Sequence, residues 1–328
     1  MRLPRSAETE ALSDEFARGC RNEARRTPLG EDAHDVQIRL AHDQVRANIV
    51  VERLPLFADQ EEWARVAPHL QQVPRDHDLR KRAETTVERD QQITDKFIEF
   101  QKQDSDKPYF GFLFYDAAHG TVFPEPEFAK FKPYWERVDH ILLNNDFDAS
   151  LYHNRYKNSL YYIDSLIGDV LKNVDLDNTI VVISSDHGEE FNDHKMNYWG
   201  HTGNYSDVQV HVPLYVYMPN RQPEQIDYRT THFDVVPTMM NTLFDVQGTT
   251  SSYSVGHNLF DSSAPRDWYI AGSYYNYALV GKELMLVVNP GGHSQQLNRQ
   301  LKVEKEQKVP VDIIRHSLDE MSRFYKKG

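Results

Sequence analysis

The sequence of 328 residues contains a single cysteine, Cys20, so it can form no internal disulfide and no cysteine-rich metal site. It has no apolar run near the roughly 18 to 20 residues that cross a bilayer, and no apolar stretch follows the basic residues at its start. We therefore expect neither a transmembrane segment nor a signal peptide in this chain. Basic residues are outnumbered, 37 against 50 acidic, and the formal net charge of −13 argues against a nucleic-acid partner.

The first 83 residues are poor in aromatic side chains and in lysine. They contain three aromatic residues, no tyrosine, and 13 arginines against one lysine. This composition leaves little from which to build a core, so two interpretations stay open. Residues 1–83 are a solvated helical extension, or they come from a mispredicted or frame-shifted gene start. Their only β-like apolar run is 47–51, and we predict that they supply no central strand carrying an acidic metal ligand.

Residues 84–328 have the composition of a folded domain. Apolar residues recur at three- and four-residue spacing over 88–101 and 155–173, which predicts two amphipathic helices. The runs 109–115 and 179–185 are continuously apolar, which is typical of strands covered on both faces, as in a parallel sheet.

The remaining elements continue this alternation. We expect a third strand over 212–219, a helix over 233–243, and a long irregular insertion over 121–150. The predicted fold class is therefore α/β, with a mostly parallel sheet and helices on both faces, incomplete at its N-terminus. Ligands of such sheets gather beyond the carboxyl ends of the strands.

The most informative motif follows the predicted strand 179–185. Asp186 and His187 leave the strand end side by side, and Gly188 permits the sharp turn. A carboxylate with a neutral imidazole suits Zn²⁺ or Mn²⁺. His201 comes fourteen residues after His187, and His119 follows the earlier strand 109–115, so both side chains are predicted to reach the same place.

Each histidine also has an ordinary structural interpretation. An Asp-His pair at a strand end is often only a turn whose histidine is satisfied by hydrogen bonds. Five other histidines are expected to be structural or exposed: His140, His153, His194, His211 and His257.

The combined motifs resemble a known superfamily. Residues 184–189 (Ser-Ser-Asp-His-Gly-Glu), Gly200-His201 and the Val-Pro-Leu of 212–214 are similar to the carboxyl-terminal half of sulfatase-type members of the alkaline phosphatase superfamily. Residues 231–238 and 256–259 resemble the helix start and the later glycine turn of that family. The sequence of residues 189–201 is similar to the corresponding segment of sulfatase-like inner-membrane proteins of Gram-negative bacteria. These proteins are related to lipoteichoic acid synthase and phosphoethanolamine transferases.

The resemblance covers residues 84–328 and implies several properties. Asp186 and His187 would be metal ligands, and His201 and His119 would be catalytic residues that contact the transferred group. The cofactor would be a divalent metal (Zn, Mn, Mg or Ca), and the substrate a phosphate or sulfate ester of an envelope lipid or glycan. The implied location is the periplasmic face of the inner membrane, reached through upstream helices that this chain does not contain.

The sequence departs from the family pattern in its first segment. It shows no convincing nucleophile, Thr27 being a weak candidate, and no further acidic metal ligand. Two hypotheses follow: a metal-dependent hydrolase or transferase impaired by loss of the nucleophile segment, or a non-catalytic binding or regulatory module of the envelope that keeps the fold. An unrelated α/β ligand-binding domain is a third possibility, which the combined motifs disfavour.

Overall fold

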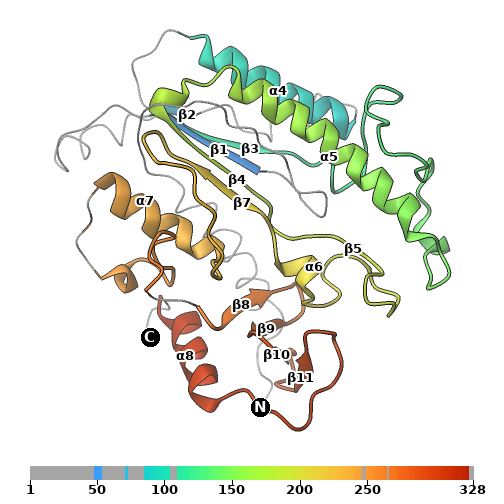
Figure 1. The fold of residues 1–328 in the computed structure, drawn as a ribbon, viewed down its shortest axis with the longest axis vertical. Coiled ribbons are helices and arrows are strands. Elements are labelled where there is room, and N and C mark those ends of the chain that lie inside the picture. The colour runs from blue at the N-terminus through green and yellow to red at the C-terminus, as the bar shows by residue number, and fades with distance from the viewer. Residues whose placement is uncertain are drawn as a thin grey trace. The chain divides into compact units, whose positions relative to one another are not determined.

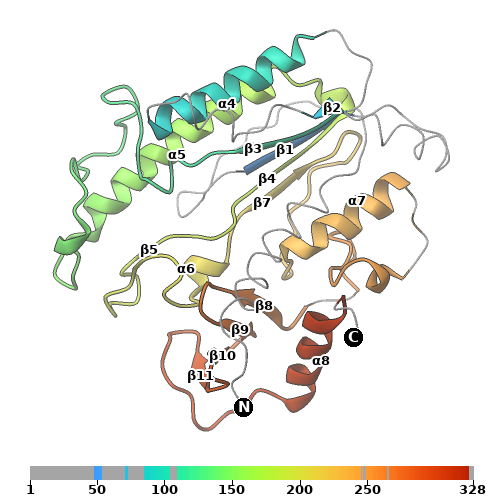
Figure 2. The ribbon, with the colours of Figure 1, turned by 180° about the vertical axis from the view of Figure 1, so that it is seen from behind.

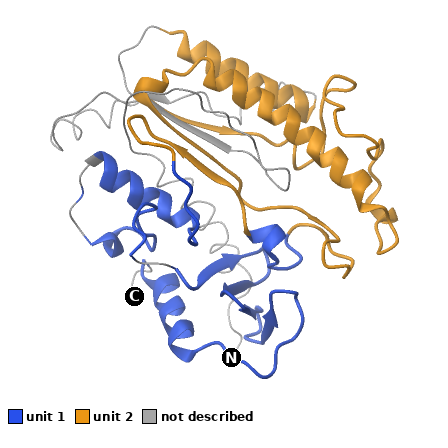
Figure 3. Cartoon of the chain, in the orientation of Figure 1, with its two compact units in different colours: residues 1–25, 202–210, 224–328 blue, residues 26–201, 211–223 orange. Residues whose placement is uncertain are grey.

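The computed structural model describes residues 48–53, 71–72, 85–103, 109–244, 246, 249–263 and 266–324. They fall into two compact units (Figure 3). The first, here called the sheet unit, takes its described residues from 26–201 and 211–223. The second takes its described residues from 202–210 and 224–328. Among these residues, no helix combines the length and the apolar character needed to cross a membrane.

The sheet unit contains a five-stranded sheet (Figure 1). In spatial order its strands are β2 (Gln71–Gln72), β3 (Tyr109–Phe114), β1 (Asn48–Arg53), β4 (Thr179–Ser184) and β7 (Leu214–Tyr217). Strand β1 pairs antiparallel with both β3 and β4, so β3 and β4 run in the same direction on either side of it. Strand β7 is antiparallel to β4, and β2 is parallel to β3.

The α/β class is confirmed, but the prediction of a mostly parallel sheet is wrong for the described residues. Three of the four strand pairings are antiparallel. A parallel neighbour requires a crossover, usually through a helix that packs on the sheet. Between β4 and β7 the chain instead forms a small hairpin, β5 (Glu190–Phe191) with β6 (Trp199–Gly200), and the four-residue helix α6 (Asp207–Val210).

The sequence predicts that residues 1–83 supply no central strand carrying an acidic metal ligand. They do supply a central strand, so that half of the prediction is wrong, and the half about the metal ligand stays a prediction. Strand β1 lies between β3 and β4, in the middle of the sheet. Its one acidic residue, Glu52, pairs with Phe110 and Ile180, close to the positions where β3 and β4 begin. The predicted site residues follow the opposite ends of those strands. By this backbone register, Glu52 is at the other end of β1 from the ends of β3 and β4 that the site residues follow.

Two helices lie side by side on one face of this sheet (Figures 1 and 2). Helix α4 (Thr86–Gln101) begins at a capping box, in which the Glu88 amide donates to Thr85 Oγ1 and the Thr85 amide donates to Glu88 Oε2. Helix α5 (Ala149–Leu171) begins six residues before the predicted start, because the Asp148 carboxylate accepts a hydrogen bond from the Ser150 amide and caps it.

The core of the sheet unit lies between these helices and the sheet. It includes the fully buried side chains of Phe97, Tyr115, Ile163 and Ile183. Strand β4 is buried along almost its whole length, as its apolar run predicted. Strand β3 is not covered on both faces as expected, since alternate side chains are more exposed and Phe112 is 40% exposed.

The second unit is built around helices and a separate antiparallel sheet. Its strands, in spatial order, are β11 (Ser294–Asn298), β10 (Leu284–Val288), β9 (Tyr277–Val280) and β8 (Tyr269–Gly272). The predicted helix over 233–243 is present as the 3-10 turn η5 (His232–Asp234) and helix α7 (Val235–Phe244), and helix α8 (Val311–Ser322) comes last. The second unit also contains the 3-10 turn η6 (Thr250–Ser252), and the sheet unit contains the 3-10 turns η3 (His140–Leu142) and η4 (Leu176–Asn178).

Candidate functional site

The turn that follows β4 is fixed by hydrogen bonds from two serines. Ser184 Oγ donates to the carbonyl of Pro213 at 2.9 Å, which ties the strand end to the segment leading into β7. Ser185 Oγ donates to the carbonyl of His187 at 2.7 Å. These bonds hold Asp186 and His187 directly beyond the end of the buried strand.

The β5–β6 hairpin returns the chain to this turn. Its register pairs Glu190 with Gly200, so the residues next to them, Glu189 and His201, also come together. Nδ1 of His201 lies 2.9 Å from Glu189 Oε2. Gly200 has a φ of +82°, and a Cβ added to it would lie 3.4 Å from Glu189 Oε1. Glycine suits this position because the backbone conformation is one that L side chains disfavour.

Three imidazole rings gather at this place. The rings of His187 and His201 are stacked with centroids 4.1 Å apart, and the ring of His119 is 5.4 Å from that of His201. Nδ1 of His187 lies 2.8 Å from the carbonyl oxygen of Gly188. Asp186 stands beside His187, with Oδ1 3.9 Å from Nε2, and its side chain is 44% exposed.

His187, Glu189 and His201 could hold a metal ion. Each offers one ligand atom, and these atoms all lie within 4.8 Å of one another. Among the described residues no other group of three or more His, Cys, Asp or Glu side chains meets this condition. Ligands at about 2.0 to 2.2 Å from one ion are roughly 3 to 3.5 Å apart, so small side-chain rotations would close the site. The donor set fits a divalent cation.

His119 reaches the group because a buried carboxylate on α4 shapes the turn after β3. Asp90 Oδ2 accepts the amides of Asp116 at 2.9 Å and Ala117 at 2.7 Å, and Asp90 is fully buried. Arg89 donates to Asp116 at 2.7 Å on the same turn. Burial raises the pKa of Asp90 to about 7, although the two amides and Arg89 oppose the shift.

The structure thus brings together all four side chains predicted from the sequence, Asp186, His187, His201 and His119. Their convergence comes from three segments: the turn after β3, the turn after β4, and the β5–β6 hairpin. The predicted nucleophile candidate Thr27 lies outside the described residues. Among the histidines expected to be structural or exposed, His194 pairs with the buried Glu190 at 3.2 Å and His211 is exposed.

Two residues of this region were not predicted to act in the site. The sequence did carry a signal for Glu189, which lies two residues after His187 in a turn that leaves a strand. It carried none for Asp90, because that residue is linked to the site only by the packing of α4 against β3.

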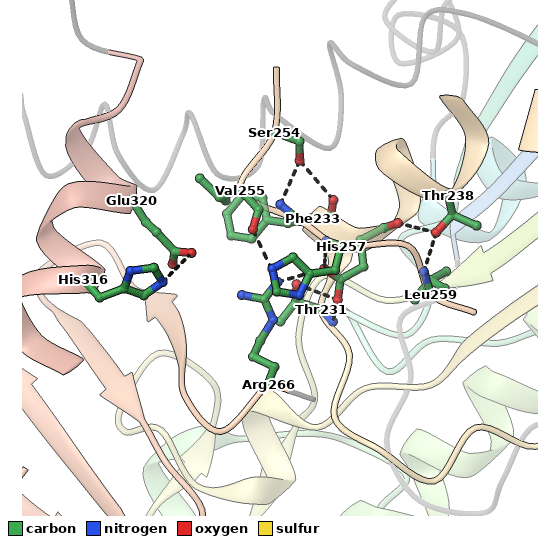
Figure 4. Close-up of polar contacts among 12 residues, drawn as sticks. Thr231, Phe233, Thr238, Ser254, Val255, His257, Leu259, Arg266, His316 and Glu320 are labelled. Atoms are coloured by element: carbon green, nitrogen blue, oxygen red, sulfur yellow. Dashed lines mark hydrogen bonds and ion pairs between the residues drawn. The ribbon is translucent and has the colours of Figure 1, made fainter. Parts of the chain in front are cut away.

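The motifs at 231–238 and 256–259 meet in the second unit, where they form a structural network (Figure 4). Asp234 accepts hydrogen bonds from Thr231, from the His257 amide and from Arg266. Thr238 Oγ1 donates to the Asp234 carbonyl and accepts from the Leu259 amide. A Cβ on Gly256 would lie 1.9 Å from the carbonyl oxygen of Phe233, which explains the glycine.

The sequence matches the model of a known protein family. The sulfatase family model matches residues 50–246, which include most of β1 and all four predicted site residues. An uncharacterized protein of Haemophilus influenzae is 27% identical over 177 residues, and the inner membrane protein YejM of Salmonella typhimurium is 26% identical over 174 residues. Each alignment covers 52% of this chain and 29% of the relative, so the chain spans well under half the length of these relatives.

A solved structure of an alkaline phosphatase superfamily protein from Vibrio parahaemolyticus is also similar. It is 18% identical, with a TM-score of 0.49, over 73% of this chain and 53% of that one. The family assignment rests on the family model, whose match covers more than half of the chain and includes the strands that position the histidines. The chain therefore belongs to the sulfatase family.

Proposed function

We propose that the group around His187 and His201 is a metal-dependent site that cleaves or transfers phosphate or sulfate esters. The observation that carries the proposal is the convergence of three imidazoles, with ring centroids 4.1 and 5.4 Å from the central His201, next to the carboxylates of Glu189 and Asp186. Imidazole and carboxylate together are the ligands of catalytic zinc and manganese sites.

In this proposal Asp186 and His187 are the residues that would bind the metal ion. A bound divalent cation would polarise an oxygen of the phosphoryl or sulfuryl group. His201 and His119 face the transferred group and hold it. A water molecule attacks phosphorus or sulfur and gives up one proton to solvent, the bond to the alcohol oxygen breaks, and that oxygen takes the proton of a protonated His119 imidazole, which solvent then reprotonates.

The proposed substrates are phosphate or sulfate esters of an envelope lipid or glycan. Support comes from the sulfatase family match and from the inner-membrane protein among the relatives. The proposed location is the periplasmic face of the inner membrane. Residues 84–328, together with the central strand β1, are proposed as the carboxyl-terminal portion of the catalytic domain, with reduced activity because the sequence shows no convincing nucleophile.

A second candidate is a non-catalytic binding or regulatory module of the envelope that keeps the fold. One observation favours it. The two hydroxyl groups that immediately precede Asp186, those of Ser184 and Ser185, donate to the backbone carbonyls of Pro213 and His187. They stabilise the turn, and neither bond prepares a nucleophile. Covalent catalysis needs a hydroxyl activated by a base or a metal.

Turnover of an aryl phosphate and an aryl sulfate, with added Zn²⁺ or Mn²⁺, tests the proposal. We expect weak turnover by the full chain and a loss of at least about tenfold in His187→Ala, with no change in the matched control His211→Ala, whose side chain is exposed. Turnover that is indifferent to His187→Ala refutes the proposed mechanism. No turnover of either ester, with the wild-type chain folded and metal present, favours the non-catalytic module.

A further inference from the structure

The turn that carries His119 is held through its backbone. The His119 side chain is exposed, whereas Ala117 and Ala118, which precede it, are buried. The His119 amide donates to the Asp116 carbonyl at 3.1 Å, so the course of the chain at His119 depends on the two residues at which the turn begins. A group that holds Asp116 and Ala117 therefore helps to determine where the His119 ring lies.

Asp90 of α4 holds both of these residues. Its Oδ2 accepts the amides of Asp116 at 2.9 Å and Ala117 at 2.7 Å, and its Oδ1 is buried with no hydrogen-bond partner among the described residues. Nη2 of Arg89 is 2.7 Å from Asp116 Oδ2 but 3.9 Å from Asp90 Oδ1. The guanidinium is thus paired with Asp116. This arrangement suits a neutral Asp90, because an unpartnered buried oxygen costs less when it carries no charge.

We propose that Asp90 is a positioning residue for His119: with its proton it holds the turn of residues 116–119 against α4, and on losing that proton it loosens the turn. The inference rests on the proposed function, in which His119 protonates the alcohol oxygen, and it gives that site a control by pH. Asp90 acts through the backbone of the turn.

The direction of this control follows from two opposing effects of ionisation. A charged Oδ2 would accept the two amides more strongly, but burial disfavours the charge. Burial is the larger effect, because it raises the pKa of Asp90 to about 7 although the amides and Arg89 oppose the shift. A group that binds its proton more tightly while the turn is held favours opening once the proton is lost. From pH 6 to pH 8 the opening equilibrium should therefore rise about tenfold.

Within the described residues, the other titratable and charged groups that face Asp90 come from three places. Arg89 is its neighbour on α4, Asp116 and Tyr115 follow β3, and Tyr162 lies on α5. Burial raises the pKa of both tyrosines, which keeps them neutral between pH 6 and pH 8. Arg89 and Asp116 form an ion pair whose charges act on Asp90 in opposite directions. The proton lost from this group near pH 7 is therefore that of Asp90.

Hydrogen exchange of the Ala117 amide in the full chain tests the hold of Asp90 without any substrate. Rates at pH 6, 7 and 8, corrected for the intrinsic pH dependence of amide exchange, give a protection factor. We expect the wild-type factor to fall about tenfold from pH 6 to pH 8, and that of Asp90→Asn, which cannot ionise, to stay constant. Asp95→Asn, on an exposed position of the same helix, is the matched control and should behave like wild type.

The amide of Val182 on β4 separates local opening from global unfolding. Val182 lies in the middle of the sheet, between its partners on β1 and β7, so its exchange reports the opening of the sheet itself. Ala117 should be less protected than Val182 at every pH. Equal protection of the two amides would show that the turn opens only when the whole unit unfolds, which refutes a local hold.

Turnover separates positioning from stability. A proton from His119 matters for phenyl phosphate, whose alcohol is a poor leaving group, and hardly for 4-nitrophenyl phosphate. At pH 6 with Zn²⁺, Asp90→Ala, which removes the acceptor for both amides, should lose at least about tenfold in kcat for phenyl phosphate and less than about threefold for 4-nitrophenyl phosphate. Asp90→Asn keeps an acceptor and should restore phenyl phosphate turnover to within about threefold of wild type.

Other outcomes overturn the inference. A protection factor of Ala117 that is the same at pH 6 and pH 8 in the wild type would show that Asp90 does not control the turn. Equal losses for the two esters in a folded Asp90→Ala, verified by circular dichroism, would make Asp90 a structural residue only. If Asp90→Ala does not fold, exchange in the wild type and in Asp90→Asn decides. Absence of turnover with either ester would refute the proposed function, while a pH-dependent protection of Ala117 would leave the hold of Asp90 on the turn standing.

Discussion

Replacing Asp90 by asparagine should remove a pH dependence from the stability of the sheet unit. Asp90 is fully buried on α4, and Oδ2 accepts the amides of Asp116 and Ala117. Its other oxygen, Oδ1, is buried without a hydrogen-bond partner. Burial raises the pKa of Asp90 from its ordinary value of 3.8 to about 7, although the two amides and the Arg89 guanidinium, 3.9 Å from Oδ1, oppose the shift.

The sign of the effect follows from proton binding. Between pH 4 and 7 the folded chain keeps the proton on Asp90 while the unfolded chain has lost it, so stability falls as the pH rises. The contribution is fully present below pH 3.8 and is lost by about pH 7. Its full size, at about 1.4 kcal/mol per pKa unit, is about 4 kcal/mol, of which about 3 kcal/mol is lost between pH 5 and pH 8.

The asparagine of this variant would keep a carbonyl oxygen for the two amides but could not ionise. We expect Asp90→Asn to be destabilised by about 1 kcal/mol at pH 5, because its new NH₂ group takes the place of the unpartnered Oδ1. Relative to wild type, the variant should then gain about 3 kcal/mol on going to pH 8.

The assay is urea unfolding at pH 5, 6, 7 and 8, followed by tryptophan fluorescence and by exchange of the Asp116 and Ala117 amides. Asp95→Asn is the matched control, since Asp95 lies on the same helix but is exposed. It should shift stability equally at every pH. A difference between Asp90→Asn and wild type that stays constant from pH 5 to pH 8 would show that Asp90 is already ionised in the folded chain.

Three glycine substitutions give further predictions. Gly256→Ala puts a Cβ 1.9 Å from the carbonyl oxygen of Phe233, so we expect a loss of at least about 3 kcal/mol in thermal unfolding, and an unchanged Tm would contradict the fit described for this turn. Gly200→Ala should cost about 1 to 2 kcal/mol in thermal unfolding, because its backbone is left-handed with φ of +82°. Gly292→Ala, with φ of +78°, should cost a similar amount, and a Tm equal to that of the wild type in both variants would contradict the expected backbone strain.

The local features of the chain were readable from the sequence because they depend on neighbouring residues. The amphipathic spacing of α4 and α5 and the apolar run of β4 predicted those elements. The motif around Asp186 and His187 indicated the site because polar residues that follow a buried strand must emerge at its end. The same signal gave His119, since β3 ends in the same direction as β4.

The tertiary structure decided what depends on residues far apart in the chain. Strand direction was one such feature, because apolar periodicity is the same whether a neighbour runs parallel or antiparallel. Sequence alone therefore missed the central antiparallel β1. The partners of His201 were another. Glu189 meets it only through the register of the β5–β6 hairpin, and Asp90 positions the turn of His119 only because α4 packs against β3. The sequence determined which side chains could do chemistry, and packing determined which of them lie within reach of one another.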